Sequence, residues 1–207
     1  MDATGKRAWQ RMLSGRRLDI LDPSPLDIEI EDVARGLSRQ PRWNGQTHGE
    51  HAFSVAQHSL LVAELMATVQ PHLPPTALLA GLLHDAAEFV TADLVTPFKR
   101  AVGKPYRDIE ARVRFAVHLA FRLPADLPPH WDQAIGAADR TAAYLEAVHL
   151  AGFQPDEARA VLGFRGAAPE VMIEPWGCER AHQTFLAVFH DLADGGMSCL
   201  RRWRAAA

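Results

Sequence analysis

Apolar residues recur every three or four positions along most of this chain, which is the spacing of one face of an α-helix. The first such run predicts a short helix over residues 29–39. The second predicts a helix that begins after the N-cap Ser54 and reaches Val69. A third run, over residues 77–90, is apolar nearly all round, as expected of a helix at the centre of a core. Further helices are predicted over residues 105–121, 130–151, 155–162 and 176–192. The pattern therefore predicts an all-α protein with six or seven main helices.

Strand and loop signals are confined to a few segments. Residues 18–22 alternate between apolar and polar like a short strand. Residues 41–53 form a loop rich in hydrogen-bonding side chains, which is typical either of solvated surface or of a binding loop. Three prolines predict a linker over residues 123–129, and the tail after Gly195 is expected to be frayed.

Length and composition restrict the class of protein. The 207 residues, 48% of them hydrophobic and 23% charged, are ordinary for a globular chain and predict a single domain over residues 1–207. A net charge of −3 provides no global basic field, so we expect neither a nucleic-acid polymer nor a membrane as partner. Cys178 and Cys199 form no CxxC motif and are expected to be reduced thiols.

Targeting signals are weak in this sequence. No apolar stretch approaches the roughly 20 residues that a transmembrane helix needs. The first residues carry Asp2, Lys6, Arg7 and Arg11 without an apolar core, so we expect no signal peptide. These observations predict a cytoplasmic protein.

Polar residues stand out within the predicted helices. His84 and Asp85 lie in the apolar run 77–90, where an ionised carboxylate costs several kcal/mol unless it is paired or bound to a metal. The plain alternative is a core histidine beside an aspartate that pairs with an arginine. His58 adjoins the apolar stripe of the preceding helix, and Asp139 lies in a stretch of small residues. Two imidazoles and two carboxylates suit a divalent metal that joins three helices of a bundle.

The order of these residues resembles a known pattern. His58, the pair His84–Asp85 and then Asp139 resemble the H…HD…D pattern of the HD-domain metal-dependent phosphohydrolases. The run from His84 to Lys99 also resembles the HDxxExxxxDxxxPxK stretch of the bacterial 5′-deoxynucleotidases in that superfamily. Arg42–Trp43 is similar to an Arg-Trp pair that those enzymes place near the nucleotide. Phage dATP triphosphohydrolases look similar over the same region, including the loop Arg42–Thr47.

The resemblance covers roughly residues 15–145 and implies an HD-domain helical bundle, with helices over residues 150–195 packed on that core. It implies one divalent metal ion (Co, Mn, Mg, Zn or Fe) that activates water for attack on phosphorus. The implied metal ligands are His58, His84, Asp85 and Asp139.

Five further residues match positions of the motif. Glu88 and Asp93 are the candidate catalytic carboxylates. A salt bridge for Glu88 and a turn-capping role for Asp93 are the alternatives. Arg42 and Lys99 are candidates for phosphate contact, and Trp43 for contact with the base or sugar. For these three the alternative is an ordinary surface position.

Three functions remain open at this point. The first is hydrolysis of a deoxynucleoside 5′-monophosphate to deoxynucleoside and phosphate. The second is hydrolysis of a deoxynucleoside triphosphate, which needs a larger positive pocket. The third is a non-catalytic helical scaffold that binds the metal for stability alone, against which the presence of Glu88 and Asp93 argues. A small-molecule nucleotide is the expected partner of the enzyme, and the sequence is compatible with a homodimer or a higher homo-oligomer.

Overall fold

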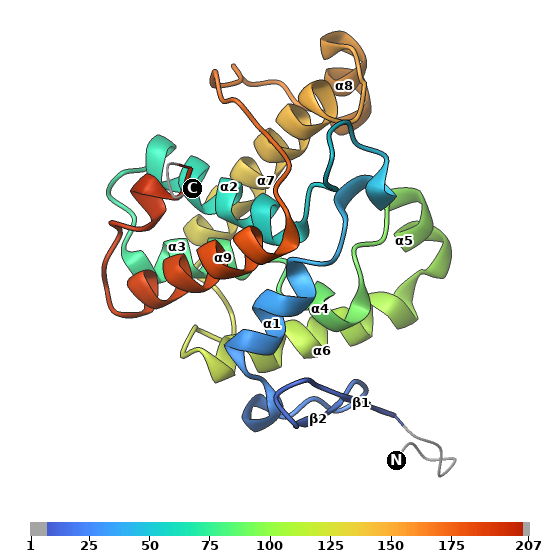
Figure 1. Ribbon diagram of the computed structural model, residues 1–207, viewed down its shortest axis with the longest axis vertical. Coiled ribbons are helices and arrows are strands. Elements are labelled where there is room, and N and C mark those ends of the chain that lie inside the picture. The colour runs from blue at the N-terminus through green and yellow to red at the C-terminus, as the bar shows by residue number, and fades with distance from the viewer. Residues whose placement is uncertain (1–7, 205–207) are drawn as a thin grey trace.

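The computed structural model describes residues 8–204, and these confirm an all-α architecture with one small β-hairpin (Figure 1). Seven of the nine α-helices in this range have eight or more residues, in agreement with the six or seven predicted. The seven are α1 (Ile30–Leu37), α2 (Val55–Val69), α3 (Pro75–Leu82), α6 (Lys104–Ala120), α7 (Pro129–His149), α8 (Pro155–Leu162) and α9 (Cys178–Ala193). The two shorter helices are α4 (Glu88–Thr91) and α5 (Thr96–Val102).

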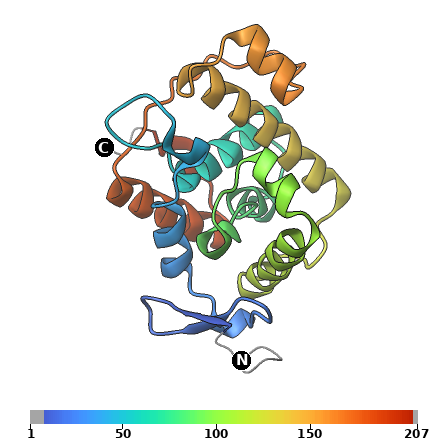
Figure 2. The same ribbon diagram turned by 90° about the vertical axis from the view of Figure 1, so that its right-hand side faces the viewer.

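The hairpin lies at one end of the molecule and α8 at the other, as both views show (Figures 1 and 2). It pairs β1 (Trp9–Arg11) with β2 (Arg17–Asp19) in antiparallel register. The predicted strand over residues 18–22 is therefore partly correct, since β2 begins one residue earlier and ends at Asp19. Asp2, Lys6 and Arg7, on which the expectation about a signal peptide mainly rests, lie outside the described residues.

Helix α2 carries the middle of the core. Ser54 caps it as predicted, because its side chain accepts a hydrogen bond from the Gln57 backbone N–H. Eleven of its fifteen residues are buried, among them His58, and the helix packs against α3, α7 and α9. A helix that is buried on most sides must satisfy its polar side chains inside the protein, and this requirement determines the surroundings of His58.

Helices α2 and α3 approach closely at Gly81. A side chain there would overlap the sulfur of Met66, which is itself buried. The close contact brings the end of α3, and with it His84, to the flank of α2. The glycine therefore contributes to the geometry of the site as well as to packing.

The prediction of one helix over residues 77–90 is wrong, because α3 ends at Leu82 and α4 begins only at Glu88. Between them, backbone hydrogen bonds join residues three apart in the sequence, such as Ala86 N–H to Leu83 O and Glu88 N–H to Asp85 O. The His84 ring also takes the Gly81 carbonyl as a partner. His84 and Asp85 therefore lie in a turn at the end of the central helix rather than within it.

The expectation of a frayed tail after Gly195 is also wrong for the part that the structure describes. Residues 200–202 form a 3-10 turn, and both Leu200 and Trp203 are buried. The Trp203 ring packs edge-on against Trp176 with centroids 5.2 Å apart. Arg204 forms an ion pair with Glu64 of α2 at 2.6 Å. Aromatic burial and this ion pair hold the segment against the helices.

Two expectations about composition agree with the described residues. Cys178 and Cys199 are both free cysteines. None of the helices within residues 8–204 combines the length and the apolar character that crossing a bilayer requires.

Candidate active site

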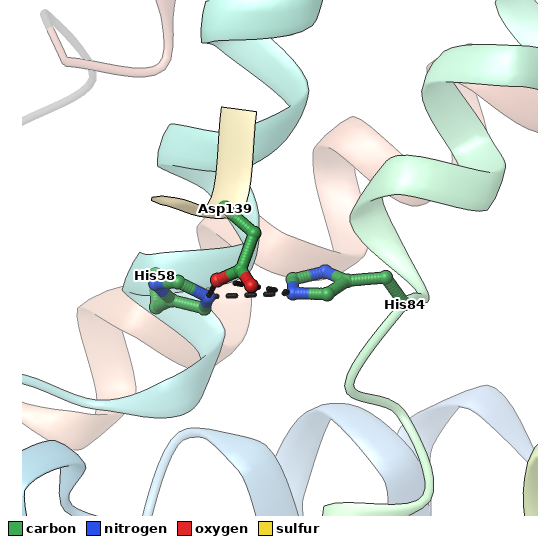
Figure 3. A group of neighbouring side chains, drawn as sticks. All are labelled: His58, His84 and Asp139. Atoms are coloured by element: carbon green, nitrogen blue, oxygen red, sulfur yellow. Dashed lines mark hydrogen bonds and ion pairs between the residues drawn. The ribbon is translucent and has the colours of Figure 1, made fainter. Parts of the chain in front are cut away.

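Four side chains from three segments meet where the end of α3 approaches α2 and α7. The Nε2 atoms of His58 and His84 face each other at 3.3 Å, and Asp139 Oδ1 lies 3.2 Å from His58 Nε2 (Figure 3). Asp85 Oδ2 lies 3.2 Å from His84 Nε2 and 3.6 Å from His58 Nε2. The structure thus brings together all four residues of the predicted ligand set, which we call the His-Asp cluster.

The second nitrogen of each ring determines how the histidines face the cluster. His58 Nδ1 lies 2.6 Å from Glu146 Oε1, and His84 Nδ1 lies 2.8 Å from the Gly81 carbonyl oxygen. Ionised carboxylates and carbonyls accept hydrogen bonds but cannot donate them, so each Nδ1 carries a proton. With Nδ1 engaged in this way, Nε2 is the nitrogen of each ring that faces the other ring and that a cation can bind. His58, His84 and Asp139 each place one ligand atom within 4.8 Å of the other two, with Asp85 beside the histidines, and this grouping fits a divalent cation. Nδ1 bonds of this kind orient histidines at metal sites.

The electrostatics of the cluster favour a cation. Burial and Arg42 lower the pKa of His58, but Glu146 and Asp139 outweigh them and raise it to about 10. Burial raises the pKa of Asp139, yet the hydrogen bond and charge of His58 lower it to about 2. The pKa of Asp85 is likewise lowered, because both histidines and Arg42 outweigh its burial. Negative surroundings that draw a proton onto His58 would equally attract a metal ion in its place.

Glu146 is a residue that the sequence analysis did not single out. Its side chain is fully buried on α7, and its Oε2 accepts from Trp43 Nε1 at 2.9 Å and from Arg42 Nε at 3.2 Å. Burial raises its pKa, but the charges of Arg42 and His58 outweigh this and lower it. A signal for it exists in the sequence: a glutamate between Leu145 and Ala147, seven residues after Asp139, faces the same way on a helix.

Arg42 and Trp43 lie in a short 3-10 segment, Arg42–Gly45, at the start of the polar loop. Arg42 is 14% exposed and bonds Glu146 through Nε and Asp93 through Nη1, the latter at 3.1 Å. Its Nη2 has no hydrogen-bond partner within residues 8–204. The guanidinium is therefore held through two of its nitrogens, and Nη2 is the one that remains available for another acceptor. Asp93, predicted as a catalytic carboxylate, acts here as a partner of Arg42.

Glu88 and Lys99 form a pair on the other side of the cluster. Lys99 Nζ lies 2.9 Å from Glu88 Oε1 and 3.1 Å from Glu110 Oε1. Glu88 is almost fully buried, and its second oxygen has no hydrogen-bond partner among the described residues. Burial, followed by repulsion from Asp85 and Asp93, raises the pKa of Glu88 despite the attraction of Lys99. Lys99, predicted to contact phosphate, is thus engaged by two carboxylates, and both roles stay predictions.

A cavity of about 390 Å³ opens beside this pair. It is lined by His84 and Asp85 of the cluster and by Glu88 and Lys99. Two arginines of α6, seven residues apart, also line it and have no ion-pair or hydrogen-bond partner for their side chains within residues 8–204; they are Arg107 and Arg114. The cluster is therefore accessible from a space that a small anionic molecule can enter.

Comparisons with known proteins identify the family. The model of the YfbR-like 5′-deoxynucleotidases matches residues 35–152, which are 118 of the 207 residues. The chain belongs to the YfbR-like 5′-deoxynucleotidase family. The matched range contains the whole His-Asp cluster, the loop with Arg42 and Trp43, and the stretch from Glu88 to Lys99. The resemblance that the motifs indicated is thereby confirmed, and membership of this YfbR-like family supports a metal-dependent phosphohydrolase of the HD superfamily.

Two relatives extend the comparison. An uncharacterised protein of Rhodobacter capsulatus is 57% identical over 158 residues, which cover 76% of this chain and 81% of that protein. The uncharacterised protein YfdR of Escherichia coli K12 is 33% identical over 98 residues, 47% of this chain and 49% of YfdR. Neither relative carries a named activity, so the substrate must be argued from the site of this YfbR-like chain.

Proposed function

We propose that this YfbR-like protein hydrolyses a deoxynucleoside 5′-monophosphate to the deoxynucleoside and phosphate. One observation carries the proposal: His58 of the His-Asp cluster and Arg42 contact the same buried carboxylate, Glu146. This shared contact supports a proposed cation site and a proposed phosphate-binding guanidinium next to each other. The family description supports the same substrate class.

The proposed metal is held by His58, His84, Asp85 and Asp139, whose donor set of two nitrogens and two carboxylates fits a divalent ion. A divalent cation in such a site supplies Lewis-acid polarisation of phosphate oxygens and lowers the pKa of water. The remaining work falls to side chains of the chain itself.

Arg42 is proposed to hold one phosphate oxygen through Nη2, while Asp93 and Glu146 fix the guanidinium plane. Trp43, the next residue in the chain, is proposed to contact the sugar or the base. In the reaction a water oxygen bonds to phosphorus, the bond from phosphorus to O5′ breaks, and the proton that water loses is balanced by one that O5′ gains. Glu88 is suited to deliver that proton, because burial raises the pKa of its carboxyl group.

A second candidate, hydrolysis of a deoxynucleoside triphosphate, is favoured by one specific feature. Arg107 and Arg114 line the cavity beside the cluster without partners of their own in the described part of the chain. Two free guanidinium groups beside the reaction centre suit further phosphates of the substrate. The products separate the candidates, since a monophosphatase releases orthophosphate and a triphosphohydrolase releases tripolyphosphate.

The deciding experiment measures product release from a panel of nucleotides. Purified protein is loaded with Mn²⁺, Co²⁺, Mg²⁺, Zn²⁺ or Fe²⁺ and given deoxynucleoside monophosphates, ribonucleoside monophosphates and deoxynucleoside triphosphates. Orthophosphate from deoxynucleoside monophosphates, abolished by EDTA and by Asp85→Asn, supports the proposal. Asp126→Asn, the same change at an exposed position, should leave the rate intact. Tripolyphosphate as the main product would support the second candidate. Metal binding without turnover would indicate a non-catalytic scaffold.

A further inference from the structure

Glu146 touches both halves of the proposed site at once. Its Oε1 contacts His58 of the cluster at 2.6 Å, and its Oε2 contacts Trp43 and Arg42 of the loop at 2.9 and 3.2 Å. The side chain is fully buried, so no solvent screens these interactions. A fully buried carboxylate costs several kcal/mol unless it is paired. Arg42 supplies the opposite charge, and His58 and Trp43 donate further hydrogen bonds to Glu146.

Three residues of helix α7 and the segment after it contact the His-Asp cluster or the loop Arg42–Gly45. Asp139 and Glu146 lie seven residues, or about two helical turns, apart on α7, and Phe153 follows seven residues later, after the helix has ended. Asp139 belongs to the His-Asp cluster, Glu146 bonds both the cluster and the loop, and the Phe153 ring lies 5.7 Å from the ring of Trp43. The loop is also tied to this end of α7 by a hydrogen bond from His48 N–H to Leu150 O. One helix therefore places the loop relative to the cluster.

The loop needs these contacts because its backbone is strained. Trp43 and Asn44 have φ values of 57° and 50°, and both lie in the left-handed region. Each such residue with a Cβ costs about 1–2 kcal/mol. Strained conformations persist only where surrounding contacts hold them in place. The hydrogen bonds that Arg42 and Trp43 donate to Glu146 are contacts of this kind. The position of the loop therefore depends on a carboxylate that His58 also holds.

We propose that Glu146 is a positioning residue that links the loop Arg42–Gly45 to His58, so that a cation in the His-Asp cluster and a phosphate on Arg42 bind cooperatively. The inference rests on the proposed function, since it assumes the cation at His58 and the phosphate at Arg42. A cation would engage His58 through Nε2 and leave Nδ1–H as the only donor of that ring, directed at Glu146 Oε1. Glu146 then keeps the loop, and Arg42 Nη2 with it, in place for the anion.

Calorimetric titration with Mn²⁺ tests the link without any turnover. Glu146→Gln keeps the size of the side chain but replaces one acceptor oxygen with a donor, which cannot satisfy His58, Arg42 and Trp43 together. We expect its Kd for Mn²⁺ to rise about 10- to 100-fold, as for other groups that orient metal-bound histidines. Inorganic phosphate should tighten Mn²⁺ binding less in this variant than in the wild type. Glu170→Gln, the same change at an exposed position, should shift the Kd by less than about twofold, as surface substitutions do.

A folded Glu146→Gln protein that binds Mn²⁺ like the wild type, with the same response to phosphate, would overturn the proposal. If Glu146→Gln does not fold, the variant Trp43→Phe tests the same link. It removes only the Nε1 donor and keeps a ring against Phe153. We expect Trp43→Phe to retain Mn²⁺ affinity but to bind inorganic phosphate about 10-fold more weakly, the effect of one charge-assisted hydrogen bond.

The kinetics of Trp43→Phe separate positioning from a merely structural role. A positioning role predicts a raised KM with little change in kcat, whereas partial unfolding would lower kcat and leave KM unchanged. The second pattern, or an unchanged phosphate affinity, would contradict the link. Should the wild type release no phosphate from any nucleotide, the proposed function fails. The Mn²⁺ and phosphate titrations still decide whether Glu146 joins the two parts of the site.

Discussion

Lys99 donates a hydrogen bond to the buried carboxyl group of Glu88 at 2.9 Å, and Glu110 holds the same ammonium group at 3.1 Å. The three side chains come from α4, α5 and α6, so the two ion pairs of Lys99 connect three helices beside the His-Asp cluster. Glu88 lines the cavity together with His84 and Asp85. One of its oxygens lacks a partner among the described residues. We therefore expect this carboxyl group to transfer a proton rather than to coordinate the metal.

Replacement of Glu88 should therefore impair turnover and leave metal binding intact. We expect Glu88→Ala and Glu88→Gln to lower kcat about 10²- to 10⁴-fold, because a positioned acid or base contributes that much. Metal content, measured by mass spectrometry of the loaded protein, should stay at the wild-type level. Glu110→Gln, the same change on the other side of Lys99, should retain most of the activity.

Either of two results would contradict this role. Near-normal turnover of Glu88→Gln would make the residue a hydrogen-bonding spacer. Loss of metal from Glu88→Ala would place it among the metal ligands, and Asp93 would then become the better candidate for proton transfer.

The raised pKa of Glu88 also predicts how stability depends on pH. Burial, the largest cause, raises this pKa to about 9 from an ordinary value of 4.5. Between these two pH values the folded protein binds the proton and the unfolded chain does not, so the contribution of Glu88 to the free energy of unfolding decreases as pH rises. The contribution is fully present below pH 4.5. Urea denaturation of metal-free protein at several pH values should show a flatter decline for Glu88→Gln than for the wild type. Parallel curves for the two proteins would contradict the raised pKa.

Removal of the metal should destabilise the fold, because the four ligands join α2, the turn after α3, and α7. Mn²⁺ at 100 times its Kd adds about 2.7 kcal/mol to the free energy of unfolding. For a chain of this size this corresponds to a rise in Tm of roughly 5–10 °C. Thermal melts with Mn²⁺ and with EDTA measure the difference. Asp85→Asn should lose the response to Mn²⁺, and Asp126→Asn should keep it. A wild type that melts at the same temperature in both conditions would argue against a metal site here.

Gly36 determines how closely α1 approaches α4, the helix that begins at Glu88. A Cβ atom at Gly36 would lie 2.7 Å from Phe89 Cβ and 3.0 Å from its backbone oxygen. Gly36→Ala should therefore lower the free energy of unfolding by about 1–3 kcal/mol, the usual effect of overpacking. Gly136→Ala is the matched control, since its Cβ would meet only the end of Arg140 at 3.4 Å and alanine favours a helix. Equal melting temperatures for Gly36→Ala and wild type would contradict the close contact.

Periodicity and residue chemistry were sufficient to predict most of the long helices and the members of the His-Asp cluster, but not the end of α3 at Leu82. The 3.6-residue spacing of apolar positions is a local property, and it located the boundaries of most long helices to within a few residues. His84–Asp85 was conspicuous because ionisable groups are costly among apolar neighbours. His58 and Asp139 were recognised by the same reasoning together with their order along the chain.

The end of the helix at Leu82 and the hydrogen-bond partner of each buried polar group depend on contacts between distant parts of the chain. Glu146 lies 104 residues from Arg42 and 88 from His58, so no local pattern indicates that one carboxylate holds both. The sequence predicts a phosphate contact for Lys99 but does not indicate its ion pairs with Glu88 and Glu110. The tail was expected to fray, yet Trp203 finds an aromatic partner in Trp176. Most buried polar groups are paired because an unpaired one costs free energy. The partner of each group depends on which helices pack together.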